Sequence, residues 1–416
     1  MPDPSEATAV TSARERRVIW LVGAIQFVNV LDFIMVMPLG PDFAAGLGIA
    51  TSQIGLVGGS YTAAAAVSGF AGSFFLDRFD RRSALAVTLL GLVIGTVLGG
   101  FATGLGTLLL SRVVAGCFGG PATSVSLAII ADVIPAARRG KALGAVMGAF
   151  SVASVLGVPV GLELARRFGW RMPFFAVGAL GLVLSAAAIA GMPALRSHLT
   201  PRAHTTAPRA PLLDSVTLLA LLNTAVTMIG VFAVVPNISA FLQHNLHYPR
   251  DRIGLLYMVG GAASFVCMRI VGSLVDKHGA GRVFLVGTAL HAVALLWGFI
   301  YAGSTTPILL VFTLFMLSGS VRMVPMQSLS SRVPGPEQRA RFMSAQSSVQ
   351  HLASAAGAMA ASVVLVAAPN GALEHMDRVA WAALVLACLA PFGIIALERR
   401  VRLREAPALP LAAVVP

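Results

Sequence analysis

Charge is scarce in this sequence. Asp, Glu, Lys and Arg together make up 11% of the 416 residues, whereas a soluble domain carries about 25% charged residues. A water-soluble fold of this size cannot cover its surface with so few charges. The scarcity excludes an ordinary soluble protein and favours a protein that sits in lipid.

Cysteine and the common catalytic signatures are also scarce. The three cysteines, Cys117, Cys267 and Cys388, lie inside apolar segments, at spacings that fit neither a disulfide framework nor a metal site. The sequence contains no Walker loop, so ATP does not drive this chain directly, and no nucleophile elbow. We therefore expect no enzymatic activity, no cofactor and no metal.

Long apolar stretches, in contrast, are abundant. Apolar residues make up 57% of the chain, and its mean hydropathy is +0.84. Stretches of about 20 residues recur along the whole length, each long enough to cross ~30 Å of hydrocarbon as a helix. The sequence predicts an all-α membrane protein of twelve helices, at residues 18–40, 53–76, 83–103, 106–132, 141–165, 173–192, 214–241, 253–274, 282–302, 306–330, 341–367 and 379–398.

The basic residues predict the orientation in the membrane. Arginine and lysine concentrate in alternate connections, namely the N-terminal segment, 77–82, 133–141, 193–213, 275–282, 331–341 and the C-terminal segment. The positive-inside rule puts these loops and both termini in the cytoplasm. Two termini on one side require an even number of helices, which agrees with twelve. The same placement explains the net charge of +13 without a nucleic-acid partner.

An internal repeat with an offset of 199 residues divides the chain. Ile54-Gly55-Leu56 corresponds to Ile253-Gly254-Leu255, Asp77-Arg78 to Asp276-Lys277, and Ile134-Pro135 to Val333-Pro334. Parallel repeats of six helices are one transporter architecture, with the substrate site between them near the midplane. The predicted domains are an N-terminal bundle (1–192), a cytoplasmic linker (193–213) and a C-terminal bundle (214–416).

Several short motifs carry a family resemblance. Residues 73–82 read SFFLDRFDRR and residues 272–279 read GSLVDKHG. Both resemble the G-x-L-x-D-R-x-G-R-R loop motif of the major facilitator superfamily, although Ser73 and Asp80 replace the glycines of the first copy. Residues 112–116 (RVVAG) resemble the family's helix-4 signature. Residues 157–161 (GVPVG) are similar to the helix-5 motif of the twelve-helix drug:proton antiporters.

The resemblance implies a cytoplasmic latch between the two halves. Asp77 would cap the start of the eleventh helix, Asp276 would by symmetry cap the fifth, and Arg81 would pair with Asp132. A carboxylate is stabilised at a helix N-terminus by the unpaired N–H groups and the helix dipole. The alternative is that these residues are ordinary loop charges of the positive-inside kind.

Asp32 and Arg112 are charged residues within predicted membrane helices, where each needs a partner or a watery cavity. Asp32 lies about 21 Å into the first helix from the cytoplasm at 1.5 Å per residue. Arg112 lies about 9 Å from the outer end of the fourth helix, which leaves roughly 21 Å to the cytoplasmic face. The two side chains can therefore meet at one depth.

Such a pair can couple transport to protons. Burial favours the protonated form of a carboxylate, and a neighbouring arginine favours the charged form. A group held between these influences can bind and release a proton as its cavity opens to each side. At offset 199, Asp32 corresponds to Val231 and Arg112 to Val311, so the pair is not needed to build a six-helix half. The alternative is a fixed brace that never titrates.

Other polar and glycine-rich positions are weaker candidates. Arg322 would face the central cavity and favour an anionic or carbonyl-bearing substrate, or else bond backbone carbonyls near Pro325. Gly157, Pro159 and Gly161 would let the fifth helix bend, as a hinge or simply for helix packing. The remaining predicted cavity residues lie on the first and eleventh helices: Gln26, Asn29, Gln350 and His351.

The preferred function is a proton-coupled efflux antiporter for small organic molecules, working by alternating access. A metabolite symporter or facilitator, and a non-transporting membrane receptor, remain alternatives. The expected partners are a small-molecule substrate, protons and the lipid bilayer, and the expected state is a monomer. The Ala- and Gly-rich composition with two lysines indicates a bacterial protein, so we expect the inner membrane.

Overall fold

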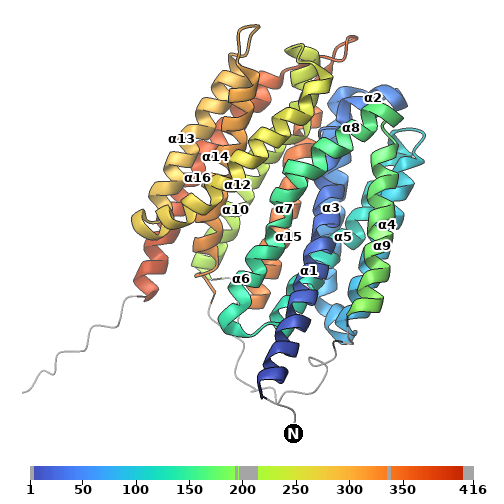
Figure 1. The fold of residues 1–416 in the computed structure, drawn as a ribbon. Helices are drawn as coiled ribbons and strands as arrows, with labels where there is room; N and C mark the ends of the chain where they lie inside the picture. Colours follow the sequence, from blue (N-terminus) through green and yellow to red (C-terminus); the bar gives the residue numbers. More distant parts are fainter. Residues whose placement is uncertain (1–3, 193–194, 196–213, 335–338, 406–416) are drawn as a thin grey trace, which may run out of the picture.

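The computed structural model describes residues 4–192, 195, 214–334 and 339–405. Two helical bundles stand side by side in it (Figure 1). We call the end that holds the start of α1 and the end of α16 the terminal face, and the other end the opposite face. The predicted linker, 193–213, lies outside the described residues except for Leu195.

The N-terminal bundle contains six membrane-length segments. Five are single helices, and one is built from consecutive helical pieces. They are α1 (Pro4–Met35), α3 (Ile54–Phe75), α4 (Arg81–Gly100), α5 (Leu105–Val133), the run of α6 (Ala136–Met147), α7 (Ala149–Val152), the π-helical turn η3 (Ala153–Gly157) and α8 (Val158–Phe168), and α9 (Met172–Gly191).

The C-terminal bundle repeats this plan. Its membrane-length helices are α10 (Ser215–Val234), α12 (Ile253–His278), α13 (Ala280–Leu295), α14 (Ile308–Ser330), α15 (Arg339–Val364) and α16 (Met376–Glu405). Short elements at the opposite face are α2 (Gly40–Leu47), α11 (Ile238–Ala240) and the antiparallel strands β1 (Val366–Ala367) and β2 (Leu373–Glu374). The predicted two-bundle, twelve-helix fold is confirmed.

The internal repeat is visible in the helix boundaries. α3 begins at Ile54 and α12 at Ile253, while α4 begins at Arg81 and α13 at Ala280. Within each pair the two starting residues are 199 positions apart, which is the offset found in the sequence. The register of the repeat is therefore kept through the second and third helices of each bundle.

Eleven of the segments in the described chain are long and apolar enough to cross a membrane, and α15 is not among them. The N-terminal half of α15 is rich in serine and glutamine. The helix lies between α3 of one bundle and α10 of the other. Protein therefore covers much of its surface, and a polar helix can be accommodated there.

Three predicted helices need correction. The first ends at Met35 instead of residue 40, because the chain turns through Pro38 into α2, which has Pro41 in its first turn. The fifth is interrupted by the π-helical turn directly before Pro159, a residue that cannot donate a backbone hydrogen bond. The seventh changes to a 3₁₀ turn at Pro236 for the same reason.

The bundles meet tightly at the opposite face and separate toward the terminal face. One hydrophobic core runs through the whole N-terminal bundle and continues into the opposite-face half of the C-terminal bundle. A second core contains C-terminal-bundle residues alone, near the terminal face, including Val216, Phe284, Leu329 and Ile394. In Figure 1 the bundles correspondingly lean together at the top and diverge below.

Candidate functional site

The centre of the N-terminal bundle contains a buried ion pair. Two guanidinium nitrogens of Arg112 on α5 donate to the two carboxylate oxygens of Asp32 on α1, at 3.0 and 2.9 Å. The side chains are 1% and 0% exposed. The Thr96 hydroxyl on α4 donates a third bond to Asp32 Oδ1, at 2.7 Å. The two residues predicted to meet at one depth are thus brought together.

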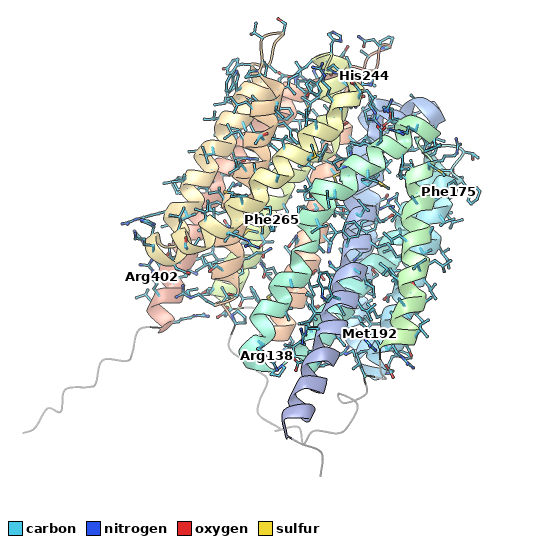
Figure 2. All side chains as sticks on the ribbon, viewed as in Figure 1. Arg138, Phe175, Met192, His244, Phe265 and Arg402 are labelled. Atoms are coloured by element: carbon cyan, nitrogen blue, oxygen red, sulfur yellow. The ribbon has the colours of Figure 1, made fainter. Side chains whose placement is uncertain are left out.

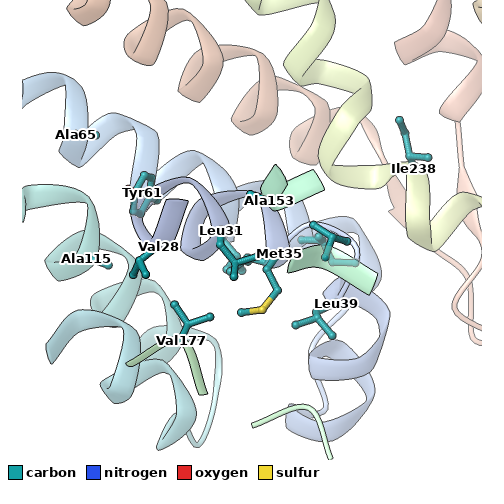
Figure 3. Close-up of a cluster of buried hydrophobic side chains, with 14 of the residues drawn as sticks. Val28, Leu31, Met35, Leu39, Tyr61, Ala65, Ala115, Ala153, Val177 and Ile238 are labelled. Carbon is teal, nitrogen blue, oxygen red and sulfur yellow. The ribbon is translucent and has the colours of Figure 1, made fainter. Parts of the chain in front are cut away.

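Apolar packing surrounds this pair. Val28, Leu31 and Met35 of α1 pack against Ala115 of α5 and Val177 of α9 within the same buried cluster (Figure 3). Water is therefore excluded from most of the surroundings of the pair. In such a medium the attraction between unit charges is much stronger than in water, and so is the penalty for leaving one of them alone.

A polar network extends from the pair toward the terminal face. The Arg112 guanidinium carbon lies 4.7 Å from the centroid of the Tyr61 ring on α3. The Tyr61 hydroxyl donates to Asn29 Oδ1 at 3.0 Å. Asn29 Nδ2 donates in turn to the Gly119 carbonyl and the Thr123 hydroxyl on α5. Asn29 is therefore a structural link among α1, α3 and α5.

Gly119 makes this crossing possible. A Cβ atom there would collide with the Tyr61 hydroxyl and lie 2.9 Å from Asn29 Oδ1. The absence of a side chain lets α3 and α1 approach α5 closely, as small residues do at membrane helix contacts. Gln26, one turn before Asn29, is also buried, and its Oε1 atom has no hydrogen-bond partner in the described structure.

The structure brings together only some of the predicted latch residues whose side chains it describes. Arg81 Nε donates to Asp132 Oδ2 at 3.2 Å, as the family pattern implies. The Asp77 side chain lies outside the described part of the structure. Asp276 is exposed, and no hydrogen bond or ion pair connects it to another described residue. Its predicted capping contact is therefore not formed in this state.

Two other carboxylates cap helices near the terminal face. Asp80 accepts from the Arg82 amide at 2.9 Å and caps α4. Glu398 of α16 accepts from the amides of Ala280 and Gly281 at the start of α13, at 3.2 and 2.8 Å. Sequence reasoning treated Asp80 as a replaced glycine. Its place directly before a helix is the signal that would have identified the cap.

The helix-5 motif forms a packing surface. A Cβ atom at Gly157 would lie 2.6 Å from Leu31 of α1, and one at Gly161 would lie 2.9 Å from Met35. On the other side Pro159 packs against Gly254 of α12. The motif thus contacts the first helix and the partner bundle at once.

Further contacts close the opposite face between the bundles. Arg250, before α12, forms a bidentate ion pair with Asp42 of α2, with its shortest N–O distance at 2.7 Å. The Ser239 hydroxyl donates to the Pro38 carbonyl at 2.9 Å. The Thr51 hydroxyl donates to the Gly371 carbonyl, also at 2.9 Å. His244, labelled in Figure 2, marks this face.

A polar cleft lies between the bundles on the terminal side of these contacts. It encloses about 220 Å³, part of it open to solvent, between α3, α5 and α15. Ser344, Ser347, Ser348 and His351 line its α15 wall. The predicted residue His351 therefore lies in a cleft between the halves, while Gln350 is half-buried on the same helix.

Arg322 does not line this cleft. Its guanidinium is 2% exposed and lies 5.3 Å from the Phe284 ring of α13, inside the C-terminal bundle. Its stem packs on Gly287, where a Cβ atom would lie 2.9 Å from it. The neighbouring His291 ring meets the Ser318 hydroxyl at 2.9 Å. Our expectation that Arg322 faces the central cavity is therefore wrong, because its side chain points between α13 and α14.

Comparison with known structures supports the fold. A bacterial homolog of the human lysosomal transporter Spinster, in an inward-facing conformation, matches with a TM-score of 0.72 at 17% identity, over 95% of this chain and 99% of that chain. A D-xylose–proton symporter matches with a TM-score of 0.75 at 16% identity, over 93% and 98%. The nucleoside transporter NupG gives 0.71 at 12%, over 91% and 99%.

The family assignment comes from the sequence of both halves. The model of the Major Facilitator Superfamily matches residues 22–223 and again residues 220–413. Each match covers one six-helix bundle, which agrees with the repeat seen in the helix boundaries. This protein is a multi-pass membrane transporter that belongs to the major facilitator superfamily.

Proposed function

We propose that this protein is a proton-coupled antiporter that exports small organic molecules by alternating access, and that Asp32 carries the coupled proton. The supporting observation is the buried pair of Asp32 and Arg112, in which both carboxylate oxygens accept hydrogen bonds from the guanidinium.

Protonation of Asp32 would change this arrangement directly. A proton on one carboxylate oxygen removes an acceptor and cancels the charge that balances Arg112. The guanidinium would then be a buried, uncompensated cation, which is strongly unfavourable. Arg112 would have to find new partners, and the contacts among α1, α4 and α5 would loosen. Binding or loss of one proton can thereby favour one bundle arrangement over another.

The orientation follows from the loop charges. We assign the terminal face to the cytoplasm of a bacterial inner membrane, because the basic residues concentrate there. The state seen here is then closed to the outside and separated toward the cytoplasm. The serine-lined cleft beside His351 is the proposed route by which a substrate enters from the cytoplasm.

The experiment measures flux in proteoliposomes with an imposed pH gradient, using a compound to which the expressed protein gives cells resistance. We expect Asp32→Asn to reduce pH-driven flux at least about tenfold.

Because this variant leaves Arg112 unpaired at a cost of about 3–5 kcal/mol, the double variant Asp32→Asn/Arg112→Gln controls for folding. Thr96→Val, which removes one hydrogen bond and no charge, should keep pH-driven flux. Unchanged pH dependence in folded Asp32→Asn would refute the coupling assignment.

Uptake by symport is the second candidate. One solved structure similar to this chain is named a D-xylose–proton symporter, and a buried carboxylate can serve either direction. The GVPVG segment of the fifth span, similar to the antiporter motif, favours export. The direction of substrate movement under an inward proton gradient separates the two: accumulation inside right-side-out vesicles indicates uptake, and depletion indicates export.

A further inference from the structure

Two phenylalanines stack where the bundles meet. Phe33 of α1 and Phe232 of α10 lie with ring centroids 6.0 Å apart and an interplanar angle of 28°. Their positions differ by 199 residues, which is the repeat offset. They are therefore equivalent residues of the two bundles. Equivalent residues that contact each other lie at the axis relating the two units.

The stack is also joined to the buried ion pair. Phe33 stacks on Tyr61 with ring centroids 5.2 Å apart. The Arg112 guanidinium in turn lies over the Tyr61 ring. Phe33 is the next residue after Asp32 on α1. Two connections therefore link the ion pair to Phe232, one through the α1 backbone and one through the Tyr61 ring.

The Phe33–Phe232 stack lies between the closed opposite face and the region where the two bundles separate. Phe33 and Phe232 are half-buried. Beyond the ends of these two helices lie Pro38 and Ser239, where the Ser239 hydroxyl donates to the Pro38 carbonyl across the closed opposite face. A shift of either ring changes the spacing of α1 and α10 just below that hydrogen bond.

We propose that Phe33, Tyr61 and Phe232 are positioning residues that transmit the state of the Asp32–Arg112 pair to the closure of the opposite face. This inference rests on the proposed proton coupling at Asp32. Its physical basis is the attraction between Arg112 and the electron-rich face of Tyr61, which is sensitive to how well Asp32 neutralises the guanidinium. When the pair rearranges, Tyr61 and Phe33 shift, and Phe232 moves the other bundle.

The charged and titratable groups around Asp32 are few. Among the described residues, Arg112 on α5 forms the ion pair with Asp32, and Tyr61 on α3 lies against its guanidinium. Among the described residues of α4, the side chain that reaches Asp32 is Thr96, and α9 carries no titratable side chain. Glu163 of α8 is engaged by Arg166 and Arg167. The opposite face itself carries the Asp42–Arg250 ion pair and His244. The Asp32→Asn variant therefore tests whether a pH response of this face originates at Asp32.

The test measures the distance across the opposite face without any substrate. Spin labels are placed on cysteines replacing the exposed Ala45 and Glu374, one in each bundle, after Cys117, Cys267 and Cys388 are changed to serine. Distance distributions are recorded from alkaline to acidic pH. We expect the otherwise unaltered protein to gain a longer-distance population as the pH falls. Phe232→Ala should lose this response, and Phe232→Tyr should keep it.

Controls separate the possible failures. Phe101→Leu removes an exposed ring that meets the Phe175 ring edge-to-face, away from the ion pair, and should respond to pH like the parent. If the parent responds but Phe232→Ala responds equally, the aromatic connection is refuted while the proton coupling stands. If the parent does not respond at all, or Asp32→Asn still responds, the coupling and the inference both fail. If Phe232→Ala does not fold, Phe33→Leu gives the same comparison with a smaller loss of volume.

Discussion

The two ends of the interface between the bundles are built differently. At the opposite face, backbone-to-backbone approach at Gly55, a bidentate ion pair and two hydrogen bonds join the halves. Toward the terminal face, the hydrophobic core of the C-terminal bundle is separate, and a serine-lined cleft lies between the halves. The difference indicates that small residues and directional bonds close one end, whereas the described residues at the other end form two separate hydrophobic cores.

The largest effect is expected from a substitution at Gly55, which we compare with the same substitution at Gly69 of the same helix, α3. A Cβ atom at Gly55 would lie 2.5 Å from the Ala358 carbonyl oxygen of α15, whereas nothing lies within 4 Å of one at Gly69. Gly55→Leu should force the bundles apart at the opposite face, since overpacking costs about 1–3 kcal/mol or more. We expect a cysteine at the buried Thr51 position to react about tenfold faster with an impermeant maleimide added at that face.

Gly69→Leu is the matched control for this change. It adds the same side chain to α3 near the cleft, where space is available, and should leave the maleimide reaction at the Thr51 position unchanged. Equal reaction rates in the two leucine variants would contradict the contrast between the ends.

A smaller effect is expected from reversing the charge of Asp42, which forms an ion pair with Arg250. Both side chains are about one quarter exposed, at 24% and 25%, so solvent screens their attraction and the pair contributes roughly 1 kcal/mol. Asp42→Arg places two cations together and should speed the same cysteine reaction about fivefold. The exchanged variant Asp42→Arg/Arg250→Asp should restore the slow rate, and a fast rate there would show that charge pairing is not what closes this face.

The smallest effect is expected at Asp214, which precedes α10 near the terminal face. Burial raises the pKa of its carboxyl, but the Thr217 amide and hydroxyl and the Arg404 guanidinium outweigh burial and lower the pKa to about 2. A lowered pKa in the folded state stabilises the protein above the unfolded value near 4, and this stabilisation is lost as the pH falls toward 2.

Asp214→Asn tests that pH dependence. Asparagine keeps a capping oxygen and removes the charge. We expect a loss of less than about 1 kcal/mol at neutral pH, because the Asp214 side chain is 37% exposed and solvent screens its charge. The loss should shrink as the pH falls through the range from about 4 to about 2. Thermal unfolding in detergent at several pH values measures it, and a constant difference across that range would argue against an electrostatic contribution.

Much of the architecture could be predicted because lipid restricts a chain more severely than water does. Apolar stretches placed the twelve helices along the chain, and eleven of them are long and apolar enough to cross a membrane. Helical rise alone brought Asp32 and Arg112 to one depth. Both predictions depend on position along a helix axis, which sequence spacing reports directly.

The rotation of each helix about its own axis, which decides the direction of its side chains, could not be predicted in the same way. Thr96, Tyr61 and Thr123 are ordinary residue types, and their contacts with the Asp32 network depend on how α3, α4 and α5 face α1. The same limitation explains Arg322, which we expected to face the central cavity but whose side chain points toward α13. The repeat offset contained one unused signal, since it pairs Phe33 with Phe232.

The polarity of α15 affects how the chain is made. A segment with this many serines and glutamines partitions poorly into hydrocarbon as a lone helix, because each polar side chain loses water without gaining a partner. Its stable insertion therefore depends on α3 and α10 already being in the bilayer to receive it. During synthesis the penultimate span should integrate late, as part of bundle assembly, and truncation before α16 should leave it vulnerable to quality-control proteases.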